Sequence, residues 1–125
     1  MPAQTDTRTL IEETAKRFLS EVPALAKLKT VVGLELHSRG DVQLYRIEMP
    51  GPRVTKAIAP DAKMTVQIQR AKFNELAARG HLADWRFAFE RGEAKATGVE
   101  QYLRLIEKVV ATQEERAHTR RARSR

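Results

Sequence analysis

Hydrophobic residues recur at every second position through most of residues 30–69, and this alternation limits the possible folds more than any other feature of the chain. Alternation places apolar side chains on one face of a β-strand, so it predicts strands that are covered on one side. The turn-forming segments "SRGD", "PGP" and "PDA" divide the region into four strands, at 30–38, 42–49, 53–59 and 63–69. We expect strands joined by such short turns to form an antiparallel meander.

Before this region, the apolar residues have helical spacing. Ile11, Ala15 and Phe18 share one face of a predicted helix over residues 7–22. Pro23 either ends this helix or forces a new short one after it.

After the strands, the helical spacing returns. A helix is predicted over 70–79, with Gly80 ending it from the C′ position, and Asp84 is predicted to cap a second, short helix. Residues 92–98 then read as a brief fifth strand, and 99–110 as an amphipathic helix. This order predicts an α+β fold with a five-stranded, mainly antiparallel sheet and helices covering one of its faces.

The positive charge of the chain is concentrated at its end. The formal net charge is +7, and it falls to +2 when the five arginines of the last ten residues are subtracted. We expect one folded domain over 1–115 and a basic, disordered tail over 116–125. Such a tail is either a solvated end or a contact for the phosphates of nucleic acid or anionic lipid. The arginines are Arg116, Arg120, Arg121, Arg123 and Arg125.

Catalytic and cofactor signatures are missing from the sequence. His37, His81 and His118 are not at metal-ligand spacing, and there is no cysteine, no G-x-S-x-G motif and no glycine-rich phosphate loop. We therefore expect no enzyme, no metal and no cofactor. A nucleic-acid partner is not favoured either, because Tyr45 is the one aromatic residue on the predicted strands. The first residues lack the profile of a signal peptide, so we expect a cytoplasmic protein.

The segment "DWRFAFERGEAKATG" combines crowded aromatic residues with unusually small ones. Trp85, Phe87 and Phe89 come first, and the predicted fifth strand then carries Ala94 and Ala96 where larger aliphatic residues are common. Small residues leave volume beside the sheet, and the aromatic rings either fill that volume or line it.

The order of features over residues 64–110 resembles the sterol carrier protein family. The shared pattern is a strand, a helix with the inward Phe73, a glycine, a short helix led by Asp84, and a strand bracketed by Gly92 and Gly98. The resemblance implies an apolar cavity between sheet and helices that takes fatty acyl chains, sterols or phospholipids, closed on one side by the helix over 99–110. Ala94 and Ala96 depart from the pattern by their size, and the basic tail is not part of it.

From this resemblance we expect a non-catalytic lipid-binding protein that is attracted to anionic membranes by its tail arginines. The alternative is a protein–protein interaction module with a filled cavity and an exposed apolar groove. The terminal helix either packs firmly on the sheet or moves to admit a ligand. The predicted lipid contacts are Phe73, Leu76, Trp85, Phe87, Phe89, Ala94, Ala96, Tyr102, Leu103, Ile106 and Val110.

Overall fold

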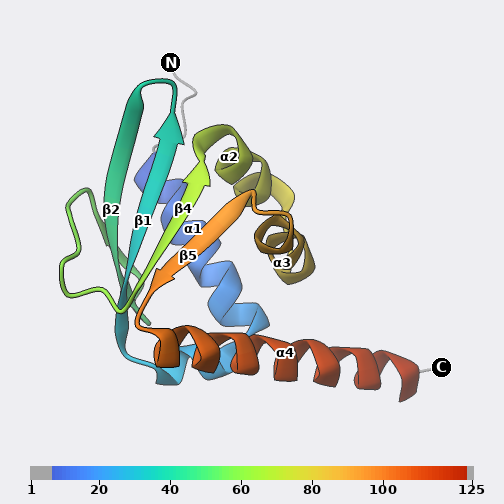
Figure 1. The fold of residues 1–125 in the computed structure, drawn as a ribbon. Coiled ribbons are helices and arrows are strands. Elements are labelled where there is room, and N and C mark those ends of the chain that lie inside the picture. Colours follow the sequence, from blue (N-terminus) through green and yellow to red (C-terminus); the bar gives the residue numbers. More distant parts are fainter. Residues whose placement is uncertain (1–6, 124–125) are drawn as a thin grey trace.

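The computed structural model describes the backbone of residues 7–123, and the side chains of this range except those of Arg79 and 117–123. Ten elements follow one another along the chain (Figure 1). They are α1 (Thr7–Glu21), the 3-10 helix η1 (Pro23–Lys27), β1 (Thr30–Ser38), β2 (Asp41–Met49), β3 (Arg53–Thr55), β4 (Met64–Gln69), α2 (Arg70–Arg79), α3 (Leu82–Glu90), β5 (Ala94–Gly98) and α4 (Glu100–Arg123).

The five strands form one sheet in the order β3-β2-β1-β4-β5. Three of the four strand pairs are antiparallel, and β1 and β4 are parallel. The predicted fold class is therefore confirmed, but the predicted meander is wrong, because β4 pairs with β1 and not with β3. The parallel pairing places the two most regularly alternating strands side by side, with Leu34 opposite Val66 and Leu36 opposite Ile68.

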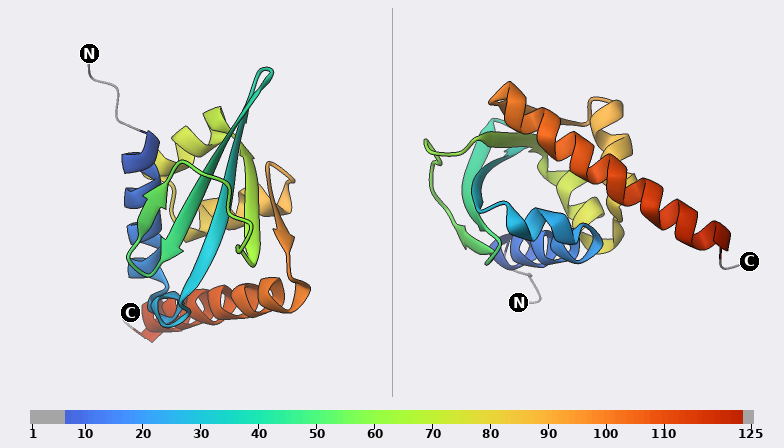
Figure 2. Two further views of the ribbon diagram at one scale, coloured as in Figure 1. Left: turned by 90° about the vertical axis from the view of Figure 1, so that its left-hand side faces the viewer. Right: turned by 90° about the horizontal axis from the view of Figure 1, so that it is seen from below.

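The connection 56–63 allows β4 to pair with β1, because it crosses from β3 to β4 over the face of the sheet away from the helices (Figure 2). The strand predicted over 53–59 accordingly ends at Thr55, and Ile58 is 67% exposed. An ion pair between Arg46 on β2 and Asp61 holds the connection, with Nη2 and Oδ2 2.6 Å apart. The hydrogen bond from Arg46 also lowers the pKa of the Asp61 carboxyl group below its ordinary value.

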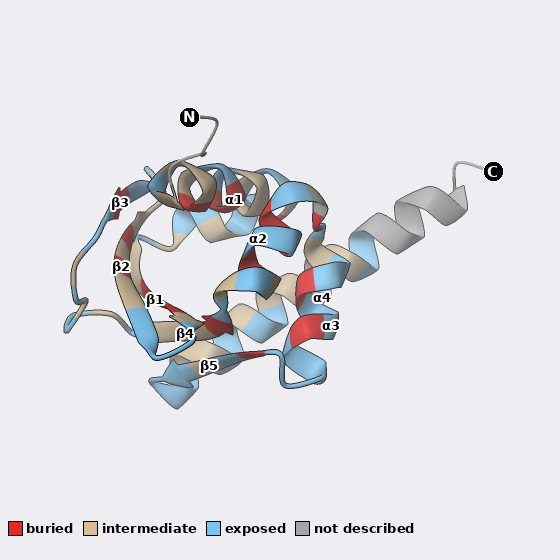
Figure 3. Cartoon of the chain, turned by 90° about the horizontal axis from the view of Figure 1, so that it is seen from above, coloured by how far each residue is buried: buried red, intermediate tan, exposed pale blue. Residues whose placement is uncertain are grey.

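Helices α1, α2 and α3 lie on the inner side of the curved sheet, and the buried residues gather between these two layers (Figure 3). Inward-facing residues of β1, β2 and β4 alternate with outward-facing polar ones, as the sequence pattern predicts. The fully buried apolar residues are Ile11, Ala15, Val22, Leu34, Leu36, Tyr45, Ile47, Val54, Ile68, Phe73, Leu76, Ala77, Trp85, Ala88 and Ala94.

Arg17 links α1 to the carboxyl end of α2. Its guanidinium group donates hydrogen bonds to the backbone oxygens of Ala77, at 3.1 Å, and Gly80, at 3.0 Å, with Leu76 O at 3.5 Å. The last carbonyls of a helix have no partner inside the helix, so a cation placed there satisfies them and interacts favourably with the helix dipole.

Gly80 ends α2 for a reason that differs from the predicted one. Its φ is −77°, so no left-handed conformation requires glycine here. A Cβ atom at this position would lie 2.6 Å from the Leu76 oxygen, so glycine is needed for space. At the next helix, Asp84 is not the N-cap as predicted but the third residue of α3. The N-cap is His81, and its backbone N–H donates a hydrogen bond to Asp84 Oδ2 at 2.8 Å.

Helix α4 crosses beneath the end of the sheet where β1 and β4 begin, and its C-terminal part extends away from the sheet (Figures 1 and 2). The chain turns into α4 at Gly98, whose φ is +141°. A Cβ atom there would lie 2.2 Å from the Lys63 oxygen, which accepts a hydrogen bond from the Val99 N–H at 3.0 Å. Gly98 thus sets the direction of α4.

Replacing Arg17 by methionine should lower the free energy of unfolding by about 2 kcal/mol, because the bonds from a charged donor to the end of α2 are lost. Urea denaturation checks this. Lys16→Met, at an exposed position of the same helix, is the control and should change stability by less than about 0.5 kcal/mol. Equal effects of the two substitutions would contradict the capping role of Arg17.

Gly98→Ala should destabilise the protein by more than Gly92→Ala. Both glycines have a positive φ, which costs an alanine about 1–2 kcal/mol, but a Cβ atom at Gly92 meets nothing within 4 Å, whereas at Gly98 it meets backbone atoms of Lys63. Thermal unfolding of the two variants gives the comparison. Similar melting temperatures would show that the close approach at Gly98 is not needed.

Candidate functional site

The space between the sheet and the helices has a closed part, next to α2 and α3. Phe73, Leu76, Trp85 and Ala94 are 2%, 4%, 7% and 1% exposed and belong to one core cluster. The Trp85 ring lies edge-on to the rings of Phe18 and Phe73, with centroid distances of 5.3 and 6.1 Å. Four of the predicted lipid contacts are therefore brought together, and they lie in the packed core.

The small residues of β5 have a packing role in this closed part. Helix α3 contacts β5, and the buried alanines of the two elements, Ala88 and Ala94, are each 1% exposed. Alanine side chains are small and let a helix approach a strand closely. At Ala94, α3 therefore fills the space that a larger strand residue would occupy. Ala96, one row further along β5, is only half-buried.

A second part of the space lies at the α4 end of the sheet, where several inward residues are half-buried, although Leu34 and Ile47 in the same rows are fully buried. In the central row, Leu36, Ile68 and Ala94 pair across three strands and are at most 2% exposed. Toward α4 the paired residues are Val66 and Ala96, then Val32 and Met64, none of which is fully buried. We call the half-buried residues of this end the α4-end patch: Val32, Met64, Val66 and Ala96 on the sheet, with Tyr102, Leu103, Ile106 and Val110 on α4.

Helix α4 contacts β5 and η1 at this end, and none of its described side chains belongs to the core cluster. Its apolar stripe is half-buried throughout, and among the α4 side chains that the structure describes none is fully buried. Helix contacts in a packed core normally bury apolar side chains completely. The four predicted contacts on α4 are thus half-buried, and their contact with lipid stays a prediction.

Polar contacts hold α4 at its start and near its middle. At its start, the Val99 N–H donates to the Lys63 oxygen, and further along, Arg86 Nε on α3 lies 2.9 Å from Glu114 Oε2. The hydrogen bond to Glu114 raises the pKa of the Arg86 guanidinium group above its ordinary value. Exposed ion pairs contribute little stability, so this attachment is weak.

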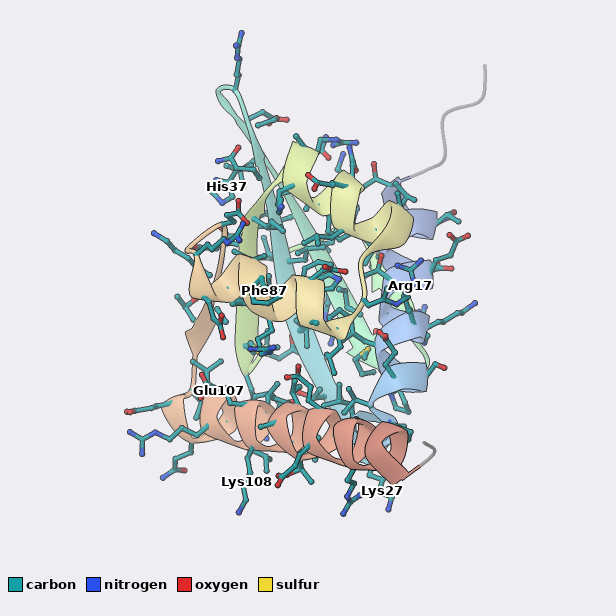
Figure 4. All side chains as sticks on the ribbon, turned by 90° about the vertical axis from the view of Figure 1, so that its right-hand side faces the viewer. Arg17, Lys27, His37, Phe87, Glu107 and Lys108 are labelled. Carbon is teal, nitrogen blue, oxygen red and sulfur yellow. The ribbon has the colours of Figure 1, made fainter. Side chains whose placement is uncertain are left out.

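Phe87 and Phe89 are exposed, unlike Trp85 on the same helix. They are 47% and 37% exposed, and the Arg86 guanidinium group lies over the Phe87 ring at 5.1 Å from its centroid. Figure 4 shows Phe87 on the outer side of α3. A contact of either ring with lipid stays a prediction.

The described histidines pair with single carboxylates and form no metal site among the described residues. His37 Nε2 pairs with Glu35 at 3.1 Å, and His81 Nδ1 lies 3.4 Å from Glu21, but no three potential ligands of a metal ion come together there. His118 lies outside the described side chains. Among the described helices, none has the length and apolar character needed to cross a membrane.

The basic tail is only partly described. The helix α4 continues to Arg123, and Arg116 is exposed. The side chains of Arg120, Arg121 and Arg123, and Arg125 as a whole, lie outside the described residues. The domain boundary at 115, the disorder of the tail and its contact with phosphates therefore stay predictions.

Two residues at the α4 end, Thr30 and Lys63, were missed by the sequence analysis, and a third, Tyr102, was predicted. Thr30 and Tyr102 have buried hydroxyl groups without a hydrogen-bond partner in the described structure, and the Lys63 ammonium group lies over the Tyr102 ring at 5.9 Å from its centroid. Tyr102 was predicted as a contact from its place on the helix, but its lack of a partner leaves no sign in the sequence. Thr30 and Lys63 are the first residues of predicted strands, and no sequence motif marked either of them as part of a site.

Known structures with the same arrangement exist, although no protein-family model and no curated protein matches the sequence. The sterol carrier protein domain 2 of Helicoverpa armigera has a TM-score of 0.57 at 13% identity, over 89% of this chain and 96% of that chain. The palmitated sterol carrier protein 2 like 2 of Aedes aegypti has a TM-score of 0.55 at 15% identity, over 84% and 95% of the two chains. UbiJ-SCP2, a ubiquinone synthesis protein, has a TM-score of 0.50 at 21% identity, over 91% and 96%.

These likenesses show that the chain has the sterol carrier protein 2 fold. They confirm the resemblance seen over residues 64–110 at the level of fold, and they extend it over most of the chain.

Proposed function

We propose that this protein binds lipid without catalysing a reaction, and that it holds an acyl chain, a sterol or a phospholipid between the sheet and α4. The observation that carries this proposal is the α4-end patch. Its eight apolar or mainly apolar side chains face the space between two layers, yet none is fully buried. A loosely covered apolar surface of this kind gains free energy when an apolar ligand fills it.

Lipid binding of this type needs no reactive groups. Each methylene group removed from water contributes about 0.8 kcal/mol, so an acyl chain of about twelve carbons supplies ample driving force even after the costs of association.

Two structural neighbours support this choice. One is a palmitated protein, and another takes part in ubiquinone synthesis, so a protein of this fold carries a fatty acyl group and another acts where a lipid is made. We extend the first of these properties to the present chain because its α4-end patch offers an apolar surface.

The alternative function, a protein-interaction module, has an observation of its own. Phe87 and Phe89 are both exposed on α3, and exposed aromatic residues are typical of protein interfaces. In that case the α4-end patch is closed by its own side chains and takes up no ligand.

A membrane contact completes the lipid-binding proposal. Figure 4 shows Lys27 of η1 and Lys108 of α4 on the side of the molecule beyond α4, and Arg116 is exposed further along the same helix. Anionic lipid attracts such residues, and a protein held this way would have its α4-end patch near the bilayer.

Mass spectrometry of the natively purified protein under gentle conditions should find about one lipid molecule per chain, or uptake of added palmitate. In Ala96→Phe, the ring should occupy the patch and abolish uptake, with a loss of stability below about 1 kcal/mol because the site has room. Thr97→Phe, on the opposite face of β5, is the control and should bind as wild type.

A wild-type protein that neither carries nor takes up lipid would contradict the proposal. So would an Ala96→Phe variant destabilised by about 1–3 kcal/mol, the cost of overpacking a filled core, with lipid uptake unchanged. These results would favour the interaction module.

Replacing the five tail arginines by serine should weaken binding to anionic vesicles and leave the uptake of monomeric lipid unchanged. The expected loss is about 1 kcal/mol for each arginine that reaches the membrane surface, measured by vesicle sedimentation at low salt. The control removes five exposed positive charges elsewhere: Lys16, Arg39, Arg53, Lys56 and Arg91, all to serine. Equal losses in both variants would show that net charge, and not the tail, attracts the protein.

A further inference from the structure

Two buried hydroxyl groups at the α4 end have no partner within the part of the chain that the structure describes. They are the Oγ1 atom of Thr30 and the phenolic oxygen of Tyr102. Thr30 is the first residue of β1, and it points to the inner face because it alternates with Val32 and Leu34. Tyr102 lies in the first turn of α4, where its backbone N–H donates to the Val99 oxygen.

A positive charge lies over the ring that carries one of these hydroxyl groups. Lys63 immediately precedes β4, its ammonium nitrogen is 5.9 Å from the Tyr102 ring centroid, and its backbone oxygen accepts the Val99 N–H. The backbone contact fixes the distance between Lys63 and the start of α4. The three polar groups and the α4-end patch therefore occupy the same end of the sheet.

Buried hydroxyl groups are normally hydrogen-bonded, because leaving a donor unpaired away from water costs free energy. Each hydroxyl group can donate one hydrogen bond, and the ammonium group supplies a full positive charge. Two donors and a cation at the edge of an apolar surface match an amphipathic ligand whose polar end is an anion.

We infer that the hydroxyl groups of Tyr102 and Thr30, with the Lys63 ammonium group, bind the carboxylate of a long-chain fatty acid. This inference rests on the proposed function, since it names the ligand class of the same site. The carboxylate oxygens accept the hydrogen bonds, Lys63 balances the negative charge, and the acyl chain lies along the α4-end patch. A carboxylate suits buried donors because it carries no further substituent, whereas the phosphodiester of a phospholipid carries one that has to reach solvent.

Isothermal titration calorimetry with palmitate and with hexadecanol, which has the same chain length and no charge, tests the assignment. Tyr102→Phe should lower the affinity for palmitate about tenfold, since a hydrogen bond to a charged group is lost. Lys63→Met should lower the affinity for palmitate several-fold and leave hexadecanol unchanged. The chain has one other tyrosine, and Tyr45→Phe, a buried change on β2, is the matched control with unchanged affinity.

The stability of the ligand-free protein provides a second readout. Tyr102→Phe removes a hydroxyl group that has no partner, so the melting temperature should stay the same or rise. If the hydroxyl group were instead bonded within the protein and had only a structural role, its removal would lower the melting temperature. The preference for palmitate over hexadecanol would then be unchanged.

Several results would overturn the assignment. Wild-type affinity for palmitate in Tyr102→Phe would do so, as would an equal loss for palmitate and hexadecanol in Lys63→Met. If an anionic phospholipid binds more tightly than palmitate, and the same variants lose this binding, then the polar end of the ligand is a phosphate and not a carboxylate. If the wild-type protein binds neither palmitate nor hexadecanol, the proposed function fails together with the assignment, whereas intact wild-type binding with unaffected variants overturns the assignment alone.

Discussion

The contact between Arg17 and the carboxyl end of α2 decides where the helical layer lies. A helix ends with carbonyl groups that have no partner, and here a guanidinium group from another helix satisfies two of them at 3.0 and 3.1 Å. The next residue of α1, Phe18, reaches the Trp85 ring on α3. Adjacent positions of one helix thus fix α2 by polar bonds and α3 by ring packing, and the closed part of the core follows from this arrangement.

This arrangement leaves the two ends of the sheet unequal. The row of Leu36, Ile68 and Ala94 is buried almost completely, while toward Gly98 the inward residues Val32, Met64, Val66 and Ala96 are half-buried. Helix α4 is attached through a backbone turn at its start and an exposed ion pair further along. The end with the weaker cover is also the end with unpaired hydroxyl groups, which is why the functional proposals concern this part of the molecule.

Much of the fold could be predicted because periodicity reports which face of an element is buried. The bounds of β1 and α2 follow directly from the pattern, and Pro23 does begin a new short helix. The pairing of β4 with β1 could not be predicted, because alternation shows that a strand has a buried face and not which neighbour it has. The outward direction of Phe87 and the isolation of the Thr30 hydroxyl group depend on how α3 and α4 are placed, and local sequence does not encode that placement.

The position of Trp85 has a spectroscopic consequence. It is the single tryptophan of the chain, it is 7% exposed, and its neighbours are the rings of Phe18 and Phe73. Its indole fluorescence therefore comes from one place, the junction of α1, α2 and α3, in apolar surroundings. Changes confined to α4 leave this emission unaltered, and its shift to longer wavelength marks the moment at which the three helices separate.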